Sequence, residues 1–97
     1  MSRVTLERAV VSRTRVATLK FALDRASTVR ITAMRKTGQR YRAAGTVSLR
    51  AAPGATRHFV RRRFGSKTLR PGRYQLKVVA IDGTLKSRTY TLPFTVR

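Results

Sequence analysis

Apolar residues recur at every second position in several short segments of this chain, and this period constrains the fold more than any other feature. The clearest case is residues 73–80, which read RYQLKVVA and place an apolar or aromatic side chain at each even position. Such alternation is typical of a β-strand with one buried face and one exposed face. β-branched and aromatic residues, which favour strands, fill these segments. We therefore expect an all-β protein.

Turn-forming residues separate the alternating segments, among them Pro53-Gly54, Pro71-Gly72 and Asp82-Gly83. We predict strands over residues 3–10, 15–23, 28–36, 40–50, 57–64, 72–81 and 86–96. About seven short strands without a helical segment favour a single antiparallel β-sandwich over residues 1–97, a length that suits one domain.

Two of the predicted strands have an interrupted pattern. In 3–10, the pair Val10-Val11 breaks the alternation, so residues 1–14 are either a first strand or an N-terminal arm. In 57–64, the parities of Phe59, Val60 and Phe64 conflict.

A local motif leads into the clearest strand and reads Leu69-Arg70-Pro71-Gly72-Arg73-Tyr74. In a sandwich, a Tyr at the start of the penultimate strand can donate its hydroxyl proton to a backbone group a few residues upstream, which is called the tyrosine corner. Here Pro71 and Gly72 would supply the turn, and Leu69 would close the end of the core. The alternative is that Tyr74 is only the first core residue of its strand. The position in the strand order favours the corner.

With these motifs the chain resembles the bacterial Ig-like or fibronectin type III-like modules of secreted and surface proteins in high-GC Gram-positive bacteria. The resemblance lies in LKFALD at 19–24, ASTVRI at 26–31, GTV at 45–47, LRPGRYQLKV at 69–78, AID at 80–82 and LPFTV at 92–96. It implies a β-sandwich and a role as spacer, stalk, accessory domain or assembly subunit, but no particular activity. The loop after Asp82 is shorter than is usual in that family, so a ligand role of that loop does not carry over.

The side chains that catalysis requires are scarce. The acidic residues are Glu7, Asp24 and Asp82, and both aspartates fall in predicted turns, so a carboxylate pair or a hard-cation site cannot be assembled. The absence of cysteine excludes thiol catalysis, disulfides and zinc–thiolate sites. His58 is the only histidine, and no nucleophile elbow or phosphate-binding glycine loop accompanies it. We therefore predict no enzymatic activity, no metal and no cofactor.

Positive charge is the remaining signal, because the chain has 23 Lys and Arg but only 3 Asp and Glu, which gives a net charge of +20. The candidate anion- or nucleic-acid-binding residues are Arg57, Arg61, Arg62 and Arg63, and in a second group Arg35, Lys36, Arg40 and Arg42. Such a surface attracts polyanions through counterion release. Tyr41 and Phe64 are the aromatic residues that could stack on exposed bases. GC-rich codon usage, which favours Arg over Lys, and protection of sheet edges are alternatives that need no ligand.

The partner expected from this charge is an anionic polymer or an acidic protein surface, met by a non-enzymatic interaction or assembly module. Self-assembly through edge strands stays open. The alternatives are a small intracellular protein that binds nucleic acid through phosphate contacts, and a passive spacer of a larger surface protein. No apolar run suits a signal peptide or reaches the ~18 residues of a membrane span. We expect an extracellular or surface location for a piece of an exported parent, and a cytoplasmic one if Met1 is the native start.

Overall fold

The computed structural model describes residues 1–97 and contains strands without any helix, which confirms the all-β prediction. Seven strands have six residues or more: β1 (Ser2–Glu7), β3 (Ala17–Leu23), β4 (Ser27–Thr37), β5 (Arg40–Ala51), β6 (Gly54–Val60), β9 (Gly72–Asp82) and β11 (Tyr90–Val96). Two-residue strands complete the set: β2 (Val10–Val11), β7 (Arg63–Phe64), β8 (Lys67–Thr68) and β10 (Leu85–Lys86).

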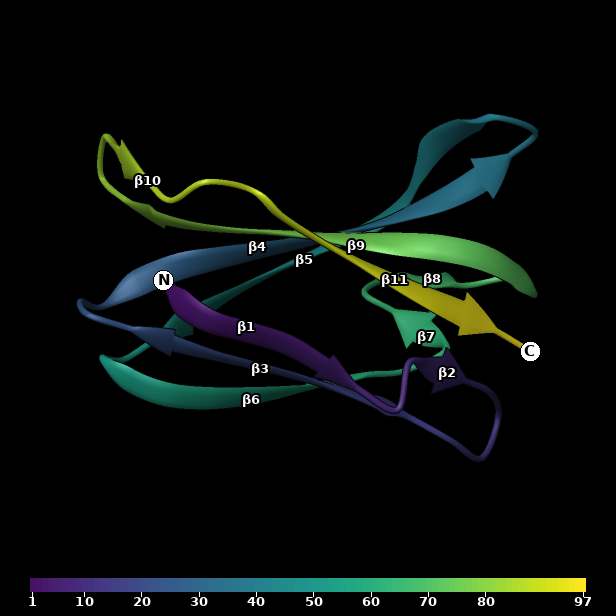
Figure 1. The fold of residues 1–97 in the computed structure, drawn as a ribbon, viewed down its shortest axis with the longest axis horizontal. Helices are drawn as coiled ribbons and strands as arrows, with labels where there is room; N and C mark the ends of the chain where they lie inside the picture. Colours follow the sequence, from purple (N-terminus) through teal and green to yellow (C-terminus); the bar gives the residue numbers. More distant parts are fainter.

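These strands form two main sheets that lie one above the other (Figure 1). One has the order β1-β3-β6, and the other has the order β2-β11-β9-β4-β5, with β10 beside β9. A third, two-stranded ladder joins β7 to β8. All pairings are antiparallel except that between β2 and β11, which is parallel. The expectation of purely antiparallel pairing is therefore wrong at that one place.

Side chains from both main sheets form one hydrophobic cluster of 18 buried residues. Leu19 and Phe21 of β3 belong to it, together with Ile31 of β4 and with Leu76 and Val78 of β9. Burial along β3 and β9 alternates residue by residue, as the period of two predicts. Each fully buried side chain of this size stabilises the fold by roughly 1.5 to 3 kcal/mol relative to an exposed one.

The predicted strand 3–10 is in fact two strands that pair with different sheets. β1 ends at Glu7 and pairs with β3, whereas β2 begins at Val10 and pairs with β11. Between them Arg8 has a φ of 54°, and the Val10 amide donates a hydrogen bond to the Arg8 carbonyl oxygen. The chain therefore crosses from one sheet to the other at this kink, and Val11 enters the core from the second sheet.

The predicted strand 57–64 is also interrupted, and its parity conflict arises because Phe59 faces outward. β6 ends at Val60, and β7 begins at Arg63 as part of the separate ladder with β8. Phe59 is 51% exposed on the outer face of β6, whereas Phe64 is only 2% exposed. The interpretation of Phe64 as an available stacking residue is therefore wrong.

The other strand predictions differ from the structure by smaller amounts. The strand predicted from residue 15 begins at Ala17, and the strand predicted from 86 is split into β10 and β11. The split occurs at Ser87, whose hydroxyl accepts a hydrogen bond from the Ala80 amide. The last tight turn consists of Gly83 and Thr84, since Asp82 still pairs with Leu85.

Candidate anion-binding end

The segment that precedes β9 has a tyrosine-corner geometry. The Tyr74 hydroxyl donates to the Arg70 carbonyl oxygen at 2.6 Å, and the Tyr74 ring stacks on Phe94 with the centroids 5.2 Å apart. Leu69 is buried in the core cluster, as expected for a residue that closes its end. Burial raises the pKa of Tyr74, while the nearby Arg35 and Arg70 charges act in the opposite direction.

Two arginines from the predicted groups dock on this corner segment. The Arg62 Nε–H donates to the carbonyl oxygen of Leu69 at 3.3 Å. Arg35 Nη2 donates to the carbonyl oxygen of Pro71 at 3.2 Å. Residues that lie 27 positions apart in the sequence are thus held on neighbouring carbonyl groups. The corner therefore brings together one member of each predicted basic group.

Gly72 makes room for the Arg35 side chain. Its φ of 155° is one that residues with a side chain rarely adopt, and a Cβ there would lie 3.3 Å from Arg35 Nε. That Nε atom is buried and has no hydrogen-bond partner. The guanidinium group is therefore packed close to Gly72 and held at the turn by its Nη2 contact to Pro71.

Further cations surround these two arginines. A hollow of about 220 Å³ is lined by Arg35, Lys67 and Arg70, along with Thr68, Leu69, Ala44 and Tyr74. A second hollow nearby brings Arg13 and Arg97 beside Arg62 and Pro71. No acidic residue lines either one. We call this surface the basic end and define it as Arg13, Arg35, Arg62, Lys67, Arg70 and Arg97.

The remaining members of the 35–42 group lie on the β4–β5 hairpin, which extends away from the other strands (Figure 1). Arg35 is paired directly with Arg42, Lys36 with Tyr41, and Thr37 with Arg40. Facing like charges repel across a strand pair, so this hairpin holds positive charge without internal compensation. Tyr41 is 36% exposed.

Arg57 lies apart from the basic end. It is paired with Lys20 on the outer face of the sheet β1-β3-β6, and Lys20 forms an ion pair with Glu7 at 2.7 Å. The Lys20 hydrogen bond and charge lower the pKa of Glu7, and the Arg57 charge adds to that effect. Arg61 lies over the Phe59 ring at 5.9 Å from its centroid, and Arg63 is exposed on β7.

The sequence reasoning missed Arg13, Lys67, Arg70 and Arg97. Arg70 belongs to the corner motif and Lys67 lies two residues before it, so their proximity to the turn could be predicted from the sequence. Arg13 and Arg97 lie near opposite ends of the chain, and only the fold brings them together.

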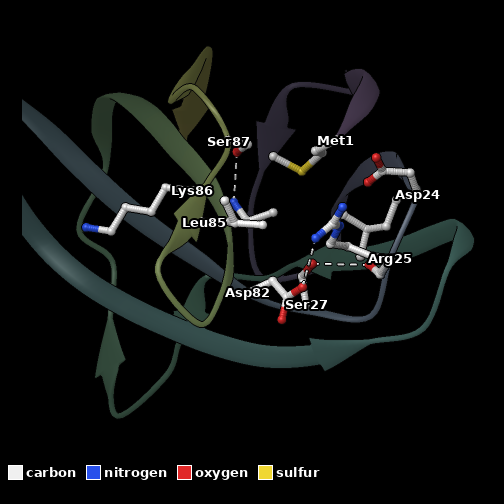
Figure 2. Close-up of a pocket in the computed structure, with 10 residues that line it drawn as sticks. Met1, Asp24, Arg25, Ser27, Asp82, Leu85, Lys86 and Ser87 are labelled. Carbon is white, nitrogen blue, oxygen red and sulfur yellow. Dashed lines mark hydrogen bonds and ion pairs between the residues drawn. The ribbon is translucent and has the colours of Figure 1, made fainter.

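The acidic residues outside Glu7 gather elsewhere, around a pocket of about 170 Å³ (Figure 2). Asp24 and Asp82 line it together with Arg25, which pairs with Asp82 at 3.5 Å. Ser87 also lines it, but its hydroxyl accepts from the Ala80 amide and donates to the Arg88 carbonyl oxygen. Because both of these interactions are with the backbone, Ser87 has a structural role in the β9–β10 region.

The structure contains no group of three His, Cys, Asp or Glu side chains that could hold a metal ion. It also contains no helix of the length and hydrophobicity needed to cross a membrane. Comparisons of the chain with protein-family models, with curated proteins and with solved structures found no match.

Proposed function

We propose that this chain is a non-enzymatic Ig-like or fibronectin type III-like β-sandwich module. The strand order supports this proposal, because β1-β3-β6 lies over β11-β9-β4-β5 and both sheets contribute to one core. The Tyr74–Arg70 hydrogen bond at the start of the penultimate long strand is a hallmark of such domains. The fold alone indicates no activity, so the charged surface is the better guide to function.

The surface supports an interaction or assembly module whose basic end contacts an anionic polymer or an acidic protein surface. The observation that carries this proposal is the docking of Arg35 and Arg62 on the corner carbonyls. These bonds order two long side chains before a partner arrives, which lowers the entropy that binding must remove. An arginine held in this way still has free N–H groups for carboxylate, phosphate or sulfate oxygens.

The balance of charge favours binding over mere solubility. Only two ion pairs form, Lys20–Glu7 and Arg25–Asp82, and both are exposed. A small domain stays soluble with a net charge of about 2 to 8, whereas this chain carries +20. The excess raises local anion concentration and association rates at the basic end.

Nucleic acid is a second candidate partner because of the β4–β5 hairpin. A two-stranded ribbon fits the major groove of duplex DNA, and this one presents Arg40, Arg42 and the exposed Tyr41. This alternative needs only contacts of these cations with phosphates, which do not read the base sequence. A passive spacer without any ligand is the third interpretation.

Binding to three fluorescent anions tests the proposal: an anionic polysaccharide, duplex DNA and single-stranded DNA, each over a series of salt concentrations. The double variant Lys67→Ala/Arg70→Ala removes two cations from the basic end. Its matched control, Arg30→Ala/Lys77→Ala, removes two exposed cations from the outer face of β4 and β9. For duplex DNA each lost phosphate contact lowers the slope of log affinity against log salt by about 0.9.

We expect the basic-end variant to bind more weakly with a smaller salt slope, and the control to bind as the parent does. Equal losses in both variants would mean that the charge acts without a defined site. No binding by the parent at low salt would favour the spacer interpretation. Loss of DNA binding alone in Arg40→Ala/Arg42→Ala would favour the nucleic-acid alternative.

A further inference from the structure

Three arginines and a serine surround a hollow of about 410 Å³ beside the corner. It is lined by Ser12, Arg13, Arg62, Pro71 and Arg97. None of these residues is acidic, and the proline ring is the one apolar group among them. These residues come from the β2–β3 loop, the β6–β7 link, the turn before β9 and the end of β11. Residues near both ends of the chain and residues from the stretch between β6 and β9 therefore line one hollow.

Backbone hydrogen bonds hold each of these segments in place. The Ser12 amide donates to Arg15, and the Arg97 amide donates to Val11, at 3.0 and 2.8 Å. The Leu69 amide donates to the Arg62 carbonyl oxygen at 2.8 Å, and Arg62 Nε returns a bond to Leu69. The Cα atoms that carry the three guanidinium groups are thus fixed by the fold.

The arginine side chains retain unused donors. Arg13 and Arg97 make no side-chain hydrogen bond and no ion pair, and Arg62 uses only its Nε atom. Three positive charges around one hollow repel one another when no anion is present. A bound anion relieves this repulsion and also satisfies several N–H groups.

We propose that this hollow binds a phosphate group in its dianionic form, as free phosphate or as the end of a phosphomonoester. A guanidinium group matches the spacing of two phosphate oxygens. Three such groups suit an anion with three or more available oxygens, and a carboxylate offers only two. This inference rests on the proposed function, because the hollow is part of the basic end, and it assigns a ligand chemistry to this one hollow.

Isothermal titration calorimetry with glycerol phosphate tests the inference in the parent protein and in Arg13→Ala. Arg13 lies in an exposed loop and makes no side-chain bond, so this substitution leaves the fold intact. We expect it to weaken glycerol phosphate binding at least tenfold. Arg62→Lys keeps the charge but loses the planar fork, and we expect a similar loss. Arg30→Ala, which removes an exposed arginine far from the hollow, should bind as the parent does.

Two further experiments test the ionic form of the phosphate and the kind of molecule that carries it. The second pKa of a phosphomonoester is about 6, so binding should weaken between pH 7.5 and pH 5. Inorganic phosphate should compete with glycerol phosphate, and a dinucleotide without a terminal phosphate should not. Equal, pH-independent binding of that diester would overturn the proposal of a dianion site.

The proposed function and this inference can fail separately. If the parent binds the anionic polymers but not glycerol phosphate, the phosphate site is wrong and the interaction module stands. If glycerol phosphate binds and Arg13→Ala removes it while no polymer binds, the phosphate site stands alone. Equal binding of glycerol phosphate by Arg13→Ala and the parent overturns the site.

Discussion

The hydroxyl of Tyr74 donates a hydrogen bond to the carbonyl oxygen of Arg70 at 2.6 Å. The same short segment offers its neighbouring carbonyl groups to two arginine side chains, since Arg62 bonds to Leu69 and Arg35 bonds to Pro71. The turn that stabilises the end of the core therefore also orders the basic end. A substitution in the turn should therefore change both the free energy of unfolding and the position of these guanidinium groups.

Tyr74→Phe should lower the free energy of unfolding by about 1 kcal/mol, the value of one hydrogen bond. The ring remains to stack on Phe94, and the Arg70 carbonyl lies in an exposed residue where water can replace the hydroxyl. Urea unfolding at neutral pH measures the loss, with an unchanged slope showing that the denatured state is comparable.

Tyr90→Phe is the matched control for that variant. Its hydroxyl donates to the carbonyl oxygen of Met1 at 2.9 Å, and a terminal residue holds its partner less firmly. We expect a loss smaller than about 0.5 kcal/mol. A Tyr74→Phe midpoint equal to that of the parent would remove the energetic role of the corner.

Salt should stabilise this protein, because most of its positive charges lack an acidic partner. The Debye length falls from ~10 Å at 0.1 M to ~3 Å at 1 M salt, so added NaCl screens the repulsion between exposed cations. The melting temperature should rise with NaCl between these concentrations. Arg40→Glu/Arg42→Glu, on the exposed hairpin, should raise the melting temperature at low salt and flatten its salt dependence. Identical salt dependence in the variant and the parent would contradict this explanation.

Strands that keep a single parity could be predicted from the sequence, because burial of one face fixes every second residue. β3 and β9 meet this condition, and their buried positions follow the alternation throughout. The segments that change partner could not be predicted in the same way. Glu7 pairs with β3, whereas Val10 pairs with Thr95 of β11. This second pairing joins the two ends of the chain, so the local sequence does not reveal it.

The same distinction between local and long-range contacts applies to the candidate site. The corner could be predicted because Pro71, Gly72 and Tyr74 are adjacent and their turn chemistry is local. The convergence of Arg13 and Arg97 could not, because it depends on the parallel pairing of β2 with β11. The sequence also groups Arg57 with Arg62, but the break after Val60 separates these two residues in the structure.

Stability should fall as the pH is lowered from 7.5 toward 5, because of His58. Burial lowers the pKa of this imidazole below 6.5, and no hydrogen-bond partner or acid compensates. As the pH falls, the unfolded chain therefore takes up the proton before the folded chain does, which favours unfolding. The lowered pKa of Glu7 has its main effect at lower pH, because its contribution is lost progressively as the pH falls toward the folded pKa of this carboxyl. Urea midpoints should decline in the parent but stay level in His58→Gln; parallel declines would assign the effect to other groups.

Two phenylalanines five residues apart should lose very different amounts of stability on truncation. Phe64 is 2% exposed and lies so close to β5 that a Cβ at Gly45 would be 3.2 Å from its ring, whereas Phe59 is 51% exposed on the outer face of β6. Phe64→Ala should lower the free energy of unfolding by about 3 to 5 kcal/mol, and Phe59→Ala by less than about 1 kcal/mol.

A loss of that size can unfold a small domain outright, so Phe64→Leu provides a milder measure of the same packing. Its expected loss is about 1 to 2 kcal/mol, read from urea midpoints beside Phe59→Leu, which should match the parent. The contrast tests the burial of Phe64 and the exposure of Phe59. A large loss for Phe59→Leu with little change for Phe64→Leu would contradict the burial of Phe64 and the exposure of Phe59.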